Sequence, residues 1–176
     1  MLLSLTAQIL IASPASCHAP VAPSKSHVSS EYGTRSIMYG PRAKKQSSKT
    51  EHHSGIDIVA RVGTLVVNAL DGRVLVVSND PRGSKVVYVR SVLPNRRYLD
   101  VYYGHLDASF VKEGDLIFAG EKIGTVGKTG TFAPHLHITT KIYFRDTGAR
   151  KEVNPRSVIN FCKYEYRHLD YSRGKK

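Results

Sequence analysis

Residues 85–103 read KVVYVRSVLPNRRYLDVYY, and this stretch decides the fold. Two runs rich in valine and tyrosine, Lys85–Val92 and Tyr98–Tyr103, lie on either side of Pro94 and Asn95. Valine and tyrosine are enriched in β-strands, whereas proline and asparagine favour turns. The stretch therefore predicts two β-strands joined by a turn.

Five further runs of this kind occur between residues 56 and 144, separated by turn residues such as Asp71-Gly72 and Thr129-Gly130. They are Ile56–Ala60, Leu65–Ala69, Arg73–Ser78, Lys122–Val126 and His135–Phe144. No segment of about 12 or more residues has helical periodicity with caps. Short strands at intervals of roughly eight to twelve residues predict an all-β, mainly antiparallel domain, folded as a sandwich or an open barrel.

The composition is that of a globular protein. The sequence has 176 residues, of which 41% are hydrophobic, and this length suits one domain with appendages. No stretch approaches the roughly 18 consecutive apolar residues of a transmembrane helix, and two cysteines are too few for a disulfide scaffold. We expect residues 1–27 to be a signal-like segment and linker, residues 28–162 to be the domain, and residues 163–176 to be a basic tail.

The N-terminal segment favours export. Residues 1–12 are mostly apolar, and small residues and prolines follow them. This order is typical of a secretory signal, although no basic residue precedes Lys25. A buried N-terminal strand or helix is the alternative. Cys17 is a candidate for lipid attachment or for a disulfide with Cys162, and the sequence does not choose between them.

The formal net charge is +12, from 26 Lys and Arg residues against 14 Asp and Glu residues. Residues 24–50 carry six basic residues against Glu31, and residues 163–176 carry five against Glu165 and Asp170. Most of the excess charge therefore lies in two flanks, outside the strand-rich region. This suits association with an anionic surface. We expect no specific nucleic-acid binding, because the sequence lacks the interleaved aromatic residues of a nucleic-acid-binding β domain.

His135 and His137 are predicted to project from one face of a strand, because side chains at positions i and i+2 point the same way. Leu136 between them would then enter the core. Two neutral imidazoles on one face suit a Zn²⁺ ion. The pattern His-x-His also occurs on exposed strands, so the pair alone does not establish a metal site.

His53 and Asp57 form a second candidate pair of metal ligands. Ser54 and Gly55 are predicted to turn the chain into a strand, and Gly55 would permit a sharp bend that brings both side chains onto one ion. With His137 they would form a three-ligand site, and three protein ligands with one open position are typical of catalytic zinc. The alternatives are that Asp57 only begins the strand, and that His52 replaces His53.

The order of the motifs resembles the lysostaphin-like (LytM-type) zinc metallopeptidases, which cut peptidoglycan cross-links. The resemblance rests on His53-x-x-x-Asp57, Tyr103-Gly104-His105-Leu106 and Pro134-His135-Leu136-His137. It covers roughly residues 28–160, from Tyr32-Gly33-Thr34-Arg35 to Asn154-Pro155. It implies an open, groove-forming antiparallel sheet, a peptidoglycan substrate, and a location in the periplasm or cell envelope.

The resemblance also implies that His53, Asp57 and His137 hold one Zn²⁺ ion. His105 and His135 would then be catalytic histidines that do not bind the metal. One would accept the proton of the attacking water and pass it to the leaving amine, and the other would stabilise the oxyanion. The sequence does not say which histidine takes which role.

Two functions follow from the resemblance. The first is a zinc endopeptidase that hydrolyses peptide bonds in peptidoglycan stem or cross-bridge peptides. The alternative is a non-catalytic relative that binds cell wall or activates another wall hydrolase. All five metal and catalytic positions hold the expected residue types, which favours the enzyme. The basic flanks are then expected to associate with anionic surfaces of the envelope, and the oligomeric state is left open.

Overall fold

A computed structural model of the protein describes residues 19–36 and 50–161. Residues 1–18 of the signal-like segment, both cysteines, residues 37–49 of the basic stretch and the tail 163–176 lie outside the described residues. None of the helices in the described part is long and apolar enough to cross a membrane.

The described residues contain thirteen β-strands and two short 3₁₀ helices, η1 (Pro23–Lys25) and η2 (Pro155–Ser157). The strands are β1 (Ser26–Ser30), β2 (Gly33–Ser36), β3 (Thr50–His53), β4 (Gly55–Ala60), β5 (Leu65–Val67), β6 (Gly72–Asn79), β7 (Lys85–Leu93), β8 (Arg97–Gly104), β9 (Leu106–Ser109), β10 (Leu116–Ile117), β11 (Lys122–Val126), β12 (His135–Phe144) and β13 (Arg150–Val153). Every pairing between these strands is antiparallel. The predicted all-β class with few or no helices is therefore confirmed.

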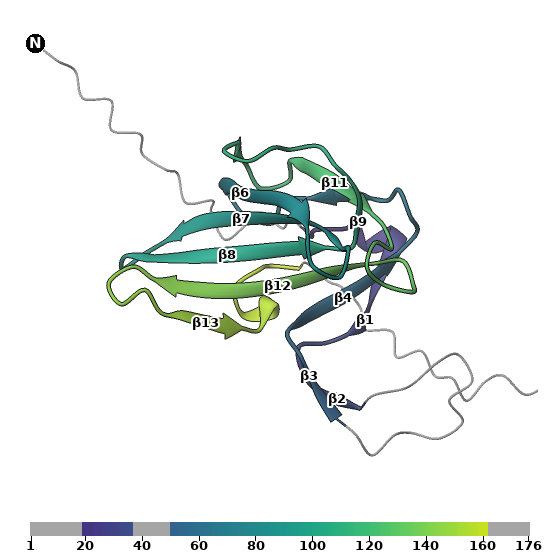
Figure 1. Cartoon of the computed structure of the whole chain (residues 1–176), viewed down its shortest axis with the longest axis horizontal. Helices are drawn as coiled ribbons and strands as arrows, with labels where there is room; N and C mark the ends of the chain where they lie inside the picture. Colours follow the sequence, from purple (N-terminus) through teal and green to yellow (C-terminus); the bar gives the residue numbers. More distant parts are fainter. Residues whose placement is uncertain (1–18, 37–49, 162–176) are drawn as a thin grey trace, which may run out of the picture.

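The strands form three sheets (Figure 1). The large sheet runs in the order β1-β4-β12-β8-β7-β6-β10, and β13 pairs with the far half of β12. A three-stranded sheet runs β5-β11-β9, and β2 pairs with β3 in a separate ribbon that extends from one end of the large sheet. Strand β12 is central, because it pairs with β4, β8 and β13. The architecture is an open sandwich rather than a barrel.

The hydrophobic core lies between the large sheet and the three-stranded sheet. Alternate residues of β4, β8 and β12 point into it. The fully buried members include Ile56, Ile58, Val101, Tyr103, Leu136 and Ile138 from the large sheet, and Val66, Leu106, Ile123 and Val126 from the small one. Leu136 enters the core as predicted. The residues between these apolar positions therefore lie on the other face of the large sheet.

Tyr103 belongs to the core and not to the chemistry of the Tyr-Gly-His motif. Its side chain is fully buried. Its hydroxyl donates to Asn68 Oδ1 at 3.1 Å and accepts from the backbone N–H of Ala69 at 2.9 Å. Burial raises the pKa of Tyr103, so the phenol stays neutral. These hydrogen bonds hold Tyr103 in place near the end of β8, directly before Gly104 and His105.

Candidate active site

Strand register places His137 and Asp57 side by side. His137 on β12 is the direct partner of Asp57 on β4 and of Gly104 on β8. Both side chains point away from the core, because their neighbours Ile56, Ile58, Leu136 and Ile138 are buried. His137 Nδ1 lies 2.7 Å from Asp57 Oδ1.

His53 completes the cluster from the end of β3. Its Nε2 lies 3.2 Å from Asp57 Oδ1 and 3.2 Å from His137 Nδ1. One ligand atom from each of the three residues lies within 4.8 Å of the others, and His53 is buried. The structure therefore brings together the three residues that the sequence analysis named as metal ligands. Two imidazole nitrogens and one carboxylate oxygen form a donor set that suits Zn²⁺.

In each of His53, Asp57 and His137, the polar atom that faces away from the cluster contacts another group. His53 Nδ1 donates to the backbone oxygen of Glu31 at 2.8 Å, which leaves the lone pair of Nε2 directed at the cluster. His137 Nε2 lies 2.9 Å from Thr139 Oγ1, and Arg35 Nη1 donates to Asp57 Oδ2 at 3.2 Å. These partners orient the donor atoms before any ion arrives. Nothing in the sequence alone pointed to these contacts.

Asp57 is ionised in this environment. Burial by itself raises its pKa, but the close contacts of its carboxylate with the imidazoles of His137 and His53 outweigh burial and hold the pKa well below the usual range of a carboxyl group. A metal ligand must be deprotonated to bind. The ionised state of Asp57 therefore fits a metal site. Its contacts with His53, His137 and Arg35 offset the cost of placing a carboxylate between two buried isoleucines.

His52 lies outside the cluster. It is exposed, its Nε2 lies 3.0 Å from Glu152 Oε1, and its ring meets Tyr32 edge-on at a centroid distance of 5.1 Å. Successive side chains of a strand point to opposite faces, so His52 and His53 cannot both face Asp57. The structure thus separates the two adjacent histidines in favour of His53.

His105 follows β8 in a left-handed backbone conformation, with φ of 62°. This conformation is uncommon for a residue with a side chain and often marks a functional site. Its Nδ1 donates to the backbone oxygen of Thr129 at 2.8 Å, and its N–H donates to Ser84 Oγ at 2.9 Å. Burial and the nearby His135 and His137 lower the pKa of His105 despite its bond to Thr129. The neutral imidazole, with Nε2 unprotonated, is therefore favoured.

His135 stands beside His105 at the start of β12. Their ring centroids are 4.6 Å apart, and His135 Nδ1 donates to the backbone oxygen of Ala133 at 2.9 Å. Its Nε2 lies 3.6 Å from Asp57 Oδ1. Neither His105 nor His135 belongs to the three-residue cluster, but both border it. Five chemically active side chains thus gather at one place.

These residues lie at one end of a groove of about 830 Å³. Its floor is the outer face of β8 and β12, with Tyr102, Thr139 and Lys141. Asp80 and Arg82 line one side, and Arg35 and Glu51 line the other. Tyr102 stays protonated, since burial raises its pKa to about 12. The groove leads from the cluster along the outer face of the sheet as far as Lys141 and Arg150.

Gly55 acts differently from the expectation that it would permit a sharp bend. It does not have a positive φ. Instead, a Cβ at this position would lie 2.2 Å from the backbone oxygen of Ile138 and 2.8 Å from His137 Cε1. A glycine is required because β4 and the ring of His137 approach each other closely.

Replacing Gly55 with alanine is therefore expected to lower both stability and metal affinity. The added methyl group cannot fit without moving β12, and overpacking of this kind costs about 1–3 kcal/mol. Displacement of His137 should weaken Zn²⁺ binding about 10- to 100-fold, as loss of an orienting contact does. Urea denaturation of the metal-free protein and competition with a chromogenic chelator measure the two effects. Gly63→Ala is the control, since its Cβ meets nothing within 4 Å although φ is 84°. It should lower stability but leave Zn²⁺ affinity unchanged, and an equal loss of affinity would contradict the proposed contact.

The part of the chain that carries the histidine and aspartate cluster matches a known protein family. The sequence model of peptidase family M23 matches residues 51–155. This range holds all five histidine and aspartate side chains described above. The chain belongs to peptidase family M23. The resemblance to the lysostaphin-like peptidases is thereby confirmed.

The M23 domain is similar to two bacterial proteins that are named for different functions. Peptidoglycan DD-endopeptidase ShyB of Vibrio cholerae is 34% identical over 122 residues, which cover 66% of this chain and 28% of ShyB. Murein hydrolase activator NlpD of Salmonella dublin is 36% identical over 103 residues, which cover 58% of this chain and 25% of NlpD. The M23 domain thus spans about a quarter of the length of these relatives.

The M23 domain also resembles a solved zinc-containing peptidase from Vibrio cholerae. The two chains superpose with a TM-score of 0.59 and 25% identity, over 78% of this chain and 38% of that chain. The large open sheet is therefore a fold that a zinc-containing peptidase also adopts.

Proposed function

We propose that the protein is a zinc-dependent endopeptidase that hydrolyses peptide bonds in peptidoglycan stem or cross-bridge peptides. The observation that carries this proposal is the convergence of His53 Nε2, Asp57 Oδ1 and His137 Nδ1 within 4.8 Å, beside two further histidines. Similarity to the endopeptidase ShyB and to a zinc-containing peptidase supports it.

The donor set fits Zn²⁺, with His53, Asp57 and His137 as the residues that would hold it. When bound, the ion would lower the pKa of a water molecule and polarise the carbonyl of the scissile bond. Three protein ligands would leave a position open for that water.

His105 is assigned as the proton acceptor. Its Nδ1 is occupied by Thr129, so Nε2 is the atom available to take a proton. Its lowered pKa keeps the imidazole neutral at neutral pH, and only the neutral form can accept. The proton would then pass to the amine that leaves.

His135 is assigned to the substrate oxygen. It lies next to His105 and within ion-pair distance of Asp57. Because Nδ1 bonds to Ala133, Nε2 is the atom that would carry a proton and donate it in a hydrogen bond to the carbonyl oxygen, where negative charge develops during attack. The left-handed conformation of His105 and the register of β12 hold the two rings together.

Activation of another wall hydrolase is the second candidate function, because the chain is also similar to the activator NlpD. The two functions differ in what they require of the site. An activator does not need the proton acceptor at His105, whereas a hydrolase does. Either function would place the protein at the cell envelope, which is where we propose that it acts.

Digestion of purified cell-wall sacculi tests the proposal. The zinc-loaded protein should clear the turbidity of the suspension and release peptides that mass spectrometry identifies as cleaved stem or cross-bridge peptides. A sample treated with a chelator and restored with Zn²⁺ should lose and then regain this activity. Release of no peptide from any wall type by the zinc-loaded protein would support the activator. Clearing that survives the chelator would contradict the zinc assignment.

A further inference from the structure

The groove continues along the sheet well beyond the candidate metal centre. His137, Thr139 and Lys141 occupy every second position of β12, and all three line the groove. At about 3.3 Å per residue, Lys141 lies roughly 13 Å along the strand from His137. An extended peptide held at the metal centre would therefore reach Lys141 after about four residues.

The far end of the groove is a fixed platform of tyrosine and arginine. Arg90 Nε and Nη2 donate to the two oxygens of Asp100 at 2.6 and 2.7 Å. The Cζ atom of Arg90 also lies 5.0 Å from the ring centroid of Tyr98 and 5.0 Å from that of Tyr143. The paired contacts hold Arg90 in place and occupy the carboxylate of Asp100.

Two basic side chains at this end have no carboxylate partner among the described residues. Lys141 and Arg150 are exposed, and no ion pair involves either of them in the part of the chain that the structure describes. The acids that face Lys141 from the adjacent strands are Asp100, bound to Arg90, and Glu152, bound to His52. Arg150 lies over the ring of Tyr143 at 5.6 Å. Both cations therefore remain available to a ligand.

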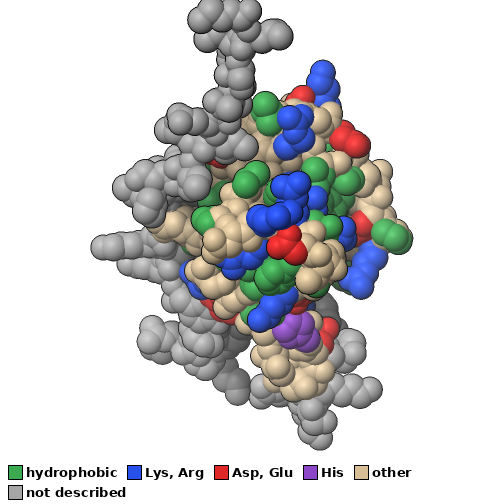
Figure 2. All heavy atoms as spheres, turned by 90° about the vertical axis from the view of Figure 1, so that its left-hand side faces the viewer, with side chains coloured by type: hydrophobic (Ala, Val, Ile, Leu, Met, Phe, Trp, Pro, Cys, Tyr) green, Lys and Arg blue, Asp and Glu red, His purple; other side chains and the backbone are tan. Residues whose placement is uncertain are grey.

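The positive charge continues onto the end of the sheet. Arg145 lies 5.9 Å from the ring centroid of Tyr98, whereas Arg150 lies over the other tyrosine of the platform, Tyr143. Figure 2 faces this end and shows Lys and Arg side chains gathered there around fewer acidic ones. An anionic group in the far half of the groove would thus meet an excess of positive charge.

We propose that Lys141 and Arg150 bind a carboxylate of the substrate peptide, several residues away from the bond that is cleaved. This inference rests on the proposed endopeptidase function, since a peptide in the groove supplies anionic groups as carboxylates. It makes the far end of the groove a determinant of substrate choice. Peptidoglycan peptides with free carboxylates at this distance would be preferred over peptides in which they are amidated.

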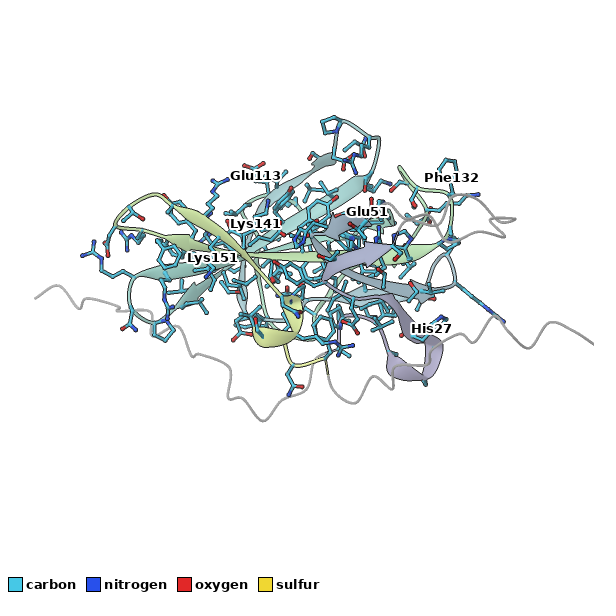
Figure 3. The ribbon with its side chains drawn as sticks, turned by 90° about the horizontal axis from the view of Figure 1, so that it is seen from below. His27, Glu51, Glu113, Phe132, Lys141 and Lys151 are labelled. Atoms are coloured by element: carbon cyan, nitrogen blue, oxygen red, sulfur yellow. The ribbon has the colours of Figure 1, made fainter. Side chains whose placement is uncertain are left out.

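Two cross-linked stem-peptide fragments of identical sequence test the inference. One carries free carboxylates and the other carries the corresponding amides. Each is made in a cleavable form, for kcat and KM, and in a fluorescent form with the cross-link amide reduced, for binding to the zinc-loaded full chain. The variant is Lys141→Met with Arg150→Met. The control is Lys151→Met, because Lys151 pairs with Ile142 and faces the other side of β13 from Arg150. Figure 3 labels Lys141 and Lys151 on their adjacent strands.

Wild type and the Lys151→Met control should bind the carboxylate form about tenfold more tightly, as expected for two partly exposed charge pairs. The double variant should bind both forms alike, with the change in KM rather than kcat. The preference should shrink at about 0.5 M NaCl, because salt screens exposed charges.

Equal binding of the two forms by the wild type would overturn the inference, and so would an equal loss in the Lys151→Met control. Cleavage of both forms with no preference would support the endopeptidase function and contradict only the proposed carboxylate site. A tenfold preference in binding without cleavage of either peptide would support the site and contradict the endopeptidase function.

Discussion

Replacement of His137 by alanine is expected to abolish zinc-dependent peptidase activity. His137 Nδ1 faces both Asp57 and His53, so its loss removes one of three donors from the proposed site. Loss of an outer contact typically weakens a metal site 10- to 100-fold, and loss of a ligand should exceed the upper end of that range. Zinc affinity measured by chelator competition and peptide release from sacculi should fall together.

His52→Ala is the matched control for this variant. His52 has the same side chain and is adjacent to His53, but it contacts Glu152 and Tyr32 instead of Asp57. Its removal should leave zinc affinity and peptide release close to the wild-type values. Loss of zinc in His52→Ala, or retention of tight zinc binding in His137→Ala, would contradict the proposed ligand set.

Replacement of His105 should stop the chemistry without removing the metal. Loss of a general base typically slows a reaction by about 10²- to 10⁴-fold. His105→Ala and His105→Gly should both show this fall in kcat with unchanged zinc affinity. They should differ in stability, because φ at this position is 62° and glycine tolerates that conformation. Urea denaturation should find the glycine variant more stable than the alanine variant by roughly 1 kcal/mol. A large loss of zinc in either variant would instead make His105 a metal ligand.

The pH dependence of peptide release by the wild-type protein provides a second measure of the proposed role of His105. Protonation of a general base removes its ability to accept, so the rate falls as pH drops through the pKa of that group. The pKa of His105 is lowered from the ordinary histidine value of 6.5 by burial and by neighbouring histidines. The midpoint of the decline should therefore lie below pH 6.5. A pH–rate profile of peptide release measures this, and a decline centred above 6.5 would contradict the assignment.

Long strands were predictable from residue type alone, whereas short ones were not. The runs predicted for β7, β8, β11 and β12 agree with the structure to within about one residue. Strands β1, β2, β3, β9, β10 and β13 were missed, since they have two to five residues and most of these residues are polar. Such segments become strands because a neighbour supplies their backbone hydrogen bonds, which propensity does not show. Strand β5 ends at Val67, because the backbone N–H groups of Asn68 and Ala69 bond to Glu121 and Tyr103 instead.

The residues that orient the candidate ligands could not be predicted from the sequence either, because these contacts depend on neighbouring strands. Arg35 and Glu31 lie in a segment that resembles the family, but nothing in the segment shows that it touches His53 and Asp57. Their contact depends on the ribbon of β2 and β3, which brings Gly33 opposite His53. Gly55 was noticed as a turn former, yet its function is the close approach of two strands.

The sequence by itself determined the kind of fold and the chemical types of the site. Runs rich in β-forming residues between turn residues specified the longer strands, and the spacing of His135 and His137 placed both on one face, opposite Leu136. Only the tertiary structure decided which atoms meet. His53 and His137 are 84 residues apart, and it is the register of β4 against β12 that sets His137 opposite Asp57. The positive φ of His105 is likewise set by Ser84 and Thr129, from loops distant in sequence. Distances of 3 Å between remote residues arise from packing, and no local pattern encodes them.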